Sequence, residues 1–147
     1  MEPFKNQFQV IWADLDPNAH MRHTAYNDYA AQVRVSLFDK FDMPLNKLVA
    51  SGFGPVLFHE DTSFYKEVFM NEKITVDCAA LAFRKDKKIW KFRQHVFKEN
   101  GNLACVIIAT GAFMDLKKRQ VVIPPEFIIK MLNRIPLTED FYTFEKE

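Results

Sequence analysis

Residues 12 to 26 read Trp-Ala-Asp-Leu-Asp-Pro-Asn-Ala-His-Met-Arg-His-Thr-Ala-Tyr, and this stretch decides the fold. Upstream of it, apolar and polar residues alternate from residue 5 to 13, with Phe8, Val10 and Trp12 on one face. Such alternation predicts a half-buried strand. The polar stretch therefore begins at the end of a predicted strand.

Downstream of it the apolar residues change their period. They recur at three- and four-residue spacing, which predicts an amphipathic helix from Tyr26 to about Phe41 with Thr24 as its N-cap. The predicted apolar stripe consists of Tyr26, Tyr29, Ala30, Val33, Leu37 and Phe38. The stretch is thus a turn between a strand and a long helix.

This turn brings a carboxylate to the start of a helix. The first N–H groups of a helix lack intrahelical acceptors and carry partial positive charge, so they can hold an oxyanion. Asp16 lies a few residues upstream, on a turn that Pro17 stiffens. The pairing offers a nucleophile or base beside an oxyanion site, whereas Asp14 is interpreted as a structural Asx-turn or cap.

The rest of the chain is predicted to be mainly an antiparallel meander. Asn100-Gly101 is typical of a tight hairpin, and Gly52 is placed to end a short helix over 45–51. A last short helix is expected over 126–133, followed by a polar and aromatic tail. The predicted strands cover residues 56–66, 73–83, 88–98 and 103–116. The apolar face of such a sheet must pack against another element, and the long helix is the available one. The sequence therefore predicts an α+β fold with the sheet wrapped around that helix.

Composition excludes several classes of function. The chain has 147 residues, few enough to favour one domain over 1–147, and a formal charge of +1, so no global field would attract nucleic acid. The N-terminus lacks a secretory signal pattern and no segment has the length of a membrane span, so we expect a cytoplasmic protein. Cys78 and Cys105 lie in apolar runs that predict buried, reduced thiols, although adjacent strands could bring them face to face.

The order of strand, Asp-rich turn, long helix and four-stranded meander resembles the hotdog fold. The turn is similar to that of the 4-hydroxybenzoyl-CoA thioesterase-like acyl-CoA thioesterases, in which an Asp-x-Asp precedes the helix and an aromatic residue follows ten positions later. Asp14, Asp16 and Tyr26 match this pattern. The Asp16-x-Asn18-x-His20 pattern also resembles acyl-ACP thioesterases of the same fold. The resemblance extends to about residue 116.

The resemblance implies hydrolysis of an acyl-CoA or acyl-ACP thioester without a cofactor or metal. It implies that Asp16 is the catalytic carboxylate and that the helix start at His23 and Thr24 supplies the oxyanion N–H groups. It also implies a homodimer with joined sheets and the acyl group between subunits, and such dimers often pair into tetramers. Close relatives often carry an acidic residue where this chain has Ala31, which leaves the substrate open.

Further residues are weaker candidates for the site. Asn18 and His20 could orient a water or contact the carbonyl, and Tyr26 could line the pocket as well as the core. Glu60 and Asp61 could face the neighbouring subunit's site, although an exposed strand face also explains them. A basic loop could hold the phosphates of coenzyme A through Arg84, Lys85, Lys87 and Lys88, as could the run Lys117-Lys118-Arg119.

Two other functions remain open from the sequence. A hotdog dehydratase or hydratase would use a His on the central helix, and no His follows His23 there. A non-catalytic acyl-thioester binder would share the fold and would keep its ligand when Asp16 is replaced.

Overall fold

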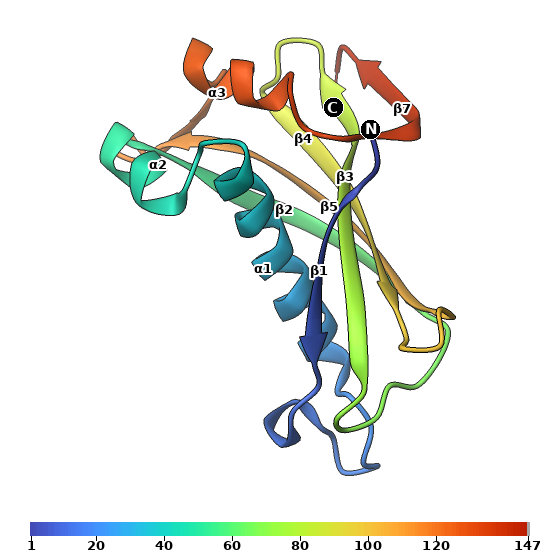
Figure 1. The fold of residues 1–147 in the computed structure, drawn as a ribbon. Helices are drawn as coiled ribbons and strands as arrows, with labels where there is room; N and C mark the ends of the chain where they lie inside the picture. The colour runs from blue at the N-terminus through green and yellow to red at the C-terminus, as the bar shows by residue number, and fades with distance from the viewer. Residues whose placement is uncertain (147) are drawn as a thin grey trace.

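The computed structural model describes residues 1–146 (Figure 1). It has seven strands, one short 3-10 helix and three α-helices among these residues. The strands are β1 (Phe4–Gln9), β2 (Phe53–Phe64), β3 (Lys73–Arg84), β4 (Ile89–Phe97), β5 (Leu103–Asp115), β6 (Gln120–Val122) and β7 (Leu137–Phe144). The helices are η1 (Trp12–Asp14), α1 (His23–Lys40), α2 (Leu45–Ser51) and α3 (Glu126–Leu132).

The strands form one sheet in the order β1-β3-β4-β5-β2, and each neighbouring pair is antiparallel. Helix α1 lies against one face of this sheet (Figure 1). The expected long helix against an antiparallel sheet is therefore confirmed. The hairpin at Gly101 and the left-handed Gly52 that ends α2 are confirmed as well, since both glycines have positive φ.

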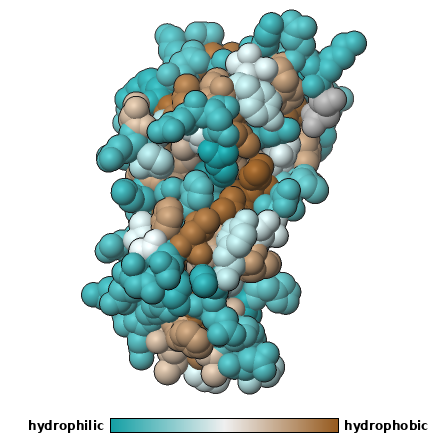
Figure 2. Space-filling view, turned by 90° about the vertical axis from the view of Figure 1, so that its right-hand side faces the viewer, coloured by the Kyte–Doolittle hydropathy of each residue, from teal (hydrophilic) through white to brown (hydrophobic). Residues whose placement is uncertain are grey.

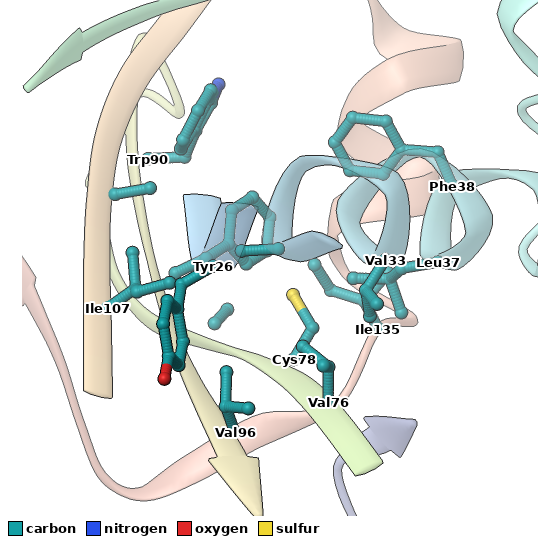
Figure 3. Packing of buried hydrophobic residues seen from close by; sticks show 14 of the residues in the cluster. Tyr26, Val33, Leu37, Phe38, Val76, Cys78, Trp90, Val96, Ile107 and Ile135 are labelled. Atoms are coloured by element: carbon teal, nitrogen blue, oxygen red, sulfur yellow. The ribbon is translucent and has the colours of Figure 1, made fainter. Parts of the chain in front are cut away.

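The core lies between α1 and the inner face of the sheet. Figure 3 shows Tyr26, Val33, Leu37 and Phe38 of α1 meeting side chains from the strands. All the predicted stripe residues are buried except Tyr29, which is half-buried. Gln94 of β4 is fully buried, and its amide donates to the Ala30 carbonyl at 2.9 Å, which ties the sheet to the helix.

The outer face of the sheet is mainly polar, with a hydrophobic band across it (Figure 2). The register pairs Arg93 and His95 of β4 with Ile108 and Val106 of β5, so polar side chains of one strand lie beside apolar side chains of the next. Arg93 forms a bidentate ion pair with Asp140 at 2.8 and 2.9 Å.

The first strand ends earlier than the sequence predicts. β1 stops at Gln9, and Trp12, expected on the packed face, is 79% exposed in η1. The chain leaves the sheet after Val10, whose N–H donates to the Glu72 carbonyl and whose carbonyl accepts from the Asn71 N–H. Gln9 pairs with Lys73, the first residue of β3, so residues 11 to 13 extend past the start of β3 and have no strand to pair with.

The long helix also begins earlier than predicted. Its first residue is His23 and its N-cap is Arg22, whereas the sequence predicted Thr24 as the N-cap. No side chain caps it. Instead, Arg22 is fixed in extended backbone geometry by its N–H, which donates to the Asp14 carbonyl at 2.8 Å. A backbone tether thus sets the start of α1 where the sequence suggested a hydroxyl cap.

Cys78 and Cys105 are buried and reduced, as expected, but they do not lie on adjacent strands. Cys78 is in β3 and Cys105 in β5, and β4 separates the two. Burial raises the pKa of the Cys105 thiol to about 12.

The C-terminal segment contains more structure than its polar composition indicated. β6 pairs antiparallel with the end of β5, and β7 pairs parallel with β3. β7 continues the edge of β3 beyond β1, since β1 pairs with residues 73–78 and β7 with residues 80–84. Figure 1 places both labelled termini at this end of the molecule.

Candidate active site

A tight reversal carries Asp16 and His20 next to each other. Leu15 and Met21 form an isolated antiparallel bridge, and the Asp16 N–H donates to the His20 carbonyl at 2.9 Å. Ala19 takes a left-handed conformation (φ 67°) to close the turn. Pro17 fits this reversal because its fixed φ suits a tight turn.

The carboxylate of Asp16 is held by several donors. Its Oδ1 accepts the backbone N–H of Asn18 at 2.9 Å and that of His20 at 3.3 Å. Its Oδ2 lies 2.9 Å from Nδ1 of the His20 ring. A carboxylate only accepts, so Nδ1 carries the proton and Nε2 of His20 points onward, 3.6 Å from the Glu67 carboxylate.

The first turn of α1 lies beside this pair with free donors. Among residues 1–146, neither the His23 N–H nor the Thr24 N–H has a protein acceptor. Unpaired N–H groups at a helix start favour negative charge in front of them. The predicted oxyanion donors are therefore available, and His23 also lines the pocket described next.

An open pocket of about 390 Å³ collects these groups. Tyr26 forms one wall, stacked edge-on against Phe64 with ring centroids 5.2 Å apart. Burial, together with nearby thiol and carboxyl groups, raises the pKa of Tyr26 to about 12, so its phenol stays protonated. The lining residues are Asp16, His20, Met21, His23, Tyr26, Phe64, Tyr65, Lys66 and Glu67.

Sequence reasoning missed the side of the pocket formed by the end of β2 and the loop that follows. This side consists of Phe64, Tyr65, Lys66 and Glu67, three of them in the loop between β2 and β3. The loop is brought to the Asp16 turn by the Met21 N–H, which donates to the Val68 carbonyl at 2.7 Å, and by a bridge between His20 and Phe69. The only signal in the sequence is a polar and aromatic run at a strand end, which does not reveal its neighbour.

Asp14, interpreted from the sequence as an Asx-turn or cap, lies outside the pocket and has other partners. Its carboxylate accepts a hydrogen bond from the Tyr29 hydroxyl and lies 3.6 Å from the Arg22 guanidinium. Burial and this hydrogen bond raise the pKa of Tyr29 above its ordinary range. Asp14 therefore fixes the turn against α1 and does not line the pocket.

The other weak candidates lie around the pocket rather than in it. Asn18 is exposed and contributes its backbone N–H to Asp16. Glu60 accepts a hydrogen bond from the Asn27 side chain on α1 at 2.8 Å, whereas Asp61 is exposed and is paired in register with Ile108. Thr24 is exposed and does not line the pocket.

The basic loop lies at the opposite end of β3. Arg84 is eleven residues beyond Lys73, which corresponds to roughly 36 Å at ~3.3 Å per residue. Arg84 pairs with Asp86 at 3.2 Å and Lys85 with Glu145 at 3.0 Å. Lys87 and Lys88 share this turn, and Lys117-Lys118-Arg119 also lies at this end, following β5. Within one chain, none of these residues lies beside Asp16.

Among residues 1–146, no group of three His, Cys, Asp or Glu side chains is arranged to hold a metal ion. The described helices include none long and apolar enough to cross a membrane. The site consists of a carboxylate–imidazole pair, free helix N–H groups and a mixed polar and aromatic wall. Such a set can activate a water and stabilise an oxyanion.

Comparison with known proteins gives a family and a fold. The sequence model of the Thioesterase-like superfamily matches residues 10–132. Curated protein sequences include none that matches.

Solved structures match over most of their length. A hypothetical protein from Aquifex aeolicus has a TM-score of 0.82 at 18% identity, with 88% of this chain and 99% of that chain covered. A hypothetical protein from Staphylococcus aureus, determined in complex with CoA, has a TM-score of 0.83 at 18% identity, covering 99% and 90%. A 1,4-dihydroxy-2-naphthoyl-CoA thioesterase from Synechocystis has a TM-score of 0.80 at 14% identity, covering 90% and 97%. At these identities the similarity establishes the fold, which is the expected hotdog fold.

Proposed function

The chain belongs to the thioesterase-like superfamily, and from that premise we propose that it hydrolyses an acyl-CoA thioester to the free acid and coenzyme A. The observation that carries the proposal is the Asp16–His20 pair, 2.9 Å apart, in a pocket that also contains the start of α1. Related structures named as CoA thioesterases, and one determined with CoA, support coenzyme A as the carrier. An acyl carrier protein would present the same thioester.

In the first step, the Asp16 carboxylate takes a proton from a water molecule and the water oxygen bonds to the thioester carbon. The carbonyl electrons move to oxygen, and the unpaired N–H groups of His23 and Thr24 are the available donors for that oxyanion. When the intermediate collapses, the C–S bond breaks and the thiolate leaves. A thiol pKa of about 8.5 makes this leaving group good enough to need little acid assistance.

Two roles are open to Asp16, the general base described above and a nucleophile. Its three donors orient the carboxylate for either role. Direct attack would instead give a mixed anhydride on Asp16, which water would then hydrolyse. In a single turnover in ¹⁸O-labelled water, label in Asp16 would establish the anhydride route, because the base route puts the label only into the acid product.

The open edge of β2 suggests a homodimer. Strand β2 pairs only with β5 among the described residues, so its outer edge is open, and it exposes Leu57 (44%) and Phe58 (51%) next to a break in register. Val35 of α1 is also partly exposed. Open edges with apolar side chains are sites where another strand pairs, so we propose that two copies join their sheets here. Light scattering of the wild type beside Leu57→Glu tests this and reveals any pairing of dimers.

The activity is tested by measuring thiol release from short, long and aromatic acyl-CoA esters. We expect Asp16→Asn to reduce kcat by about 10²–10⁴-fold, the range of general-base catalysis. Asp39→Asn is the matched control, since the same change is made on an exposed carboxylate near the end of α1, away from the pocket. Equal activity of wild type and Asp16→Asn would rule out the assigned role. A folded wild type with no turnover on any ester would rule out the acyl-CoA activity.

A further inference from the structure

A second, apolar pocket lies between α1 and the beginning of β2. Its volume is about 140 Å³, and its walls are mainly aliphatic and aromatic. It lies next to the β2 edge proposed for dimerisation, since Leu57 of that edge forms part of its wall. The lining residues are Ala31, Arg34, Val35, Phe38, Pro55, Val56, Leu57, Trp90 and Phe92.

One charged side chain, Arg34, borders this apolar pocket. The guanidinium is half-buried, and its Nη1 donates to Oε1 of Gln94 at 2.8 Å. Gln94 is fully buried, and its Nε2 donates to the carbonyls of Ala30 and Asp77, so only its oxygen is left to face Arg34. The orientation of Arg34 is therefore fixed from inside the core.

Arg34 forms no direct ion pair among the described residues, and the nearby Glu60 carboxylate is hydrogen-bonded to Asn27 instead. By contrast, the other half-buried arginines, Arg22, Arg84 and Arg93, each pair with an aspartate. A guanidinium carries five N–H donors, and Gln94 uses one of them. Ala31, one helical turn away on the same side of α1, contributes only a methyl group. The remaining donors suit a planar carboxylate from outside the chain.

Trp90 forms part of the wall of the same pocket. The indole N–H of Trp90 is buried and has no acceptor among the described residues. Figure 3 shows the indole nitrogen at the end of the ring that points away from Tyr26. Gly111 lets the indole lie close to the backbone, since a Cβ there would come within 2.3 Å of the ring. The indole therefore closes this side of the pocket with its ring.

We propose that this pocket binds the distal end of the acyl group and selects acyl groups that end in a carboxylate or another oxygen acceptor. Its size suits a compact apolar body, since an engineered apolar cavity of about 150 Å³ holds benzene. Apolar walls with a few fixed polar groups are typical of small-molecule sites. Arg34 binds the terminal carboxylate, and Trp90 forms part of the apolar wall.

The position of the pocket along α1 sets the length of the acyl group. Arg34 follows Tyr26 by eight residues, which is about 12 Å at ~1.5 Å per residue. The thioester carbon would lie in the Asp16 pocket and the terminal acceptor at Arg34. This inference rests on the proposed thioesterase function, but one of its two tests does not.

The first test compares acyl-CoA pairs of equal length that end in a carboxylate or a methyl group, such as adipoyl- with hexanoyl-CoA and suberoyl- with octanoyl-CoA. We expect the wild type to favour the carboxylate member of at least one pair in kcat/KM. Arg34→Met should lower that preference by about tenfold or more, because a site built for a polar group discriminates strongly. Arg134→Met, exposed just after α3 and outside both pockets, is the matched control. A preference that is absent from the wild type or unchanged in Arg34→Met overturns the proposal.

The second test measures binding directly and needs no turnover. Benzoate is titrated into the wild type, Arg34→Met and Trp90→Phe, with toluene as the neutral probe, and chemical shifts of the pocket residues are followed. We expect benzoate to shift pocket signals in the wild type and to bind at least about tenfold more weakly in Arg34→Met. This result would stand even if no thioester were hydrolysed. Absence of benzoate binding to the wild type would refute the proposal. Dissociation of a dimer by Arg34→Met with unchanged selectivity would also refute it, because Arg34 would then bind a carboxylate of the partner subunit.

Discussion

Nδ1 of His20 lies 2.9 Å from Oδ2 of Asp16, and this contact defines the orientation of both side chains in the pocket. The imidazole approaches from one side of the carboxylate, while two backbone N–H groups hold the other oxygen. We therefore expect His20 to position Asp16 rather than to act as the base itself.

His20→Ala should lower kcat by about tenfold, less than Asp16→Asn, because the two N–H groups at Oδ1 still hold the carboxylate. The measurement is kcat and kcat/KM for thiol release, with the melting temperature of each variant. His95→Ala is the control, because it removes another imidazole that pairs with an aspartate, Asp77 at 3.0 Å, outside the pocket. A loss of kcat in His20→Ala as large as that in Asp16→Asn would make the imidazole the base.

Tyr29→Phe should reduce stability and leave the chemistry nearly unchanged. The substitution removes the hydrogen bond from the Tyr29 hydroxyl to Asp14 and leaves a largely buried carboxylate with one donor fewer. The expected cost is about 1–3 kcal/mol in urea unfolding. Tyr142→Phe, on the partly exposed β7, serves as the control. An unchanged free energy of unfolding with a large fall in kcat would move Asp14 into the catalytic machinery.

Glu72→Gln should destabilise the protein in a pH-dependent way. Burial alone would raise the pKa of Glu72, but the N–H groups of Phe69 and Glu99 and the Lys98 ammonium overcome it and lower the pKa below 4.5. A lowered folded-state pKa adds stability above the unfolded pKa, and that stability disappears as pH falls through the folded value. Wild type and variant should differ by about 1–2 kcal/mol at pH 7 and converge in acid.

Urea unfolding at pH 7 and at about pH 3 checks this, with Glu2→Gln as the control on an exposed glutamate. A difference that stays constant with pH would show that the carboxylate charge of Glu72 contributes nothing.

Gly111→Ala should prevent stable folding. A Cβ at this position would lie 2.2 Å from the Val56 carbonyl oxygen and 2.3 Å from a ring carbon of Trp90. Relief would require separating β2 from β5 or moving the indole, at a cost of about 3 kcal/mol or more. Gly54→Ala is the matched control, because its Cβ would meet Leu116 at 3.4 Å. Equal melting temperatures for both variants would contradict the close approach of the indole.

The elements that follow a clear period could be predicted from the sequence. The apolar stripe of α1 and the four long strands were predictable because each buries one face, and burial imposes its period on the residues. Asp16 and the helix start were predictable for another reason, since they are neighbours in the sequence as well as in space.

Features set by contacts between distant segments could not be predicted. The start of α1 depends on a bond from Arg22 to Asp14, and Glu67 reaches His20 only because Val68 pairs with Met21. The sequence of β7 resembles a polar tail because β7 is an edge strand and none of its side chains is fully buried. Such pairings leave no period in the residues that make them.

The tether between the Asp16 turn and the loop before β3 has a dynamic consequence. Met21 donates to Val68, Val10 to Glu72 and Asn71 to Val10, while the Lys98 ammonium donates to the Glu67 carbonyl. Opening the loop alone would break all of these at once, so His20 and Glu67 should fluctuate together as one cooperative unit. The amide hydrogen of Met21 should then exchange with solvent as slowly as those of the central strands, whereas that of His23 should exchange rapidly.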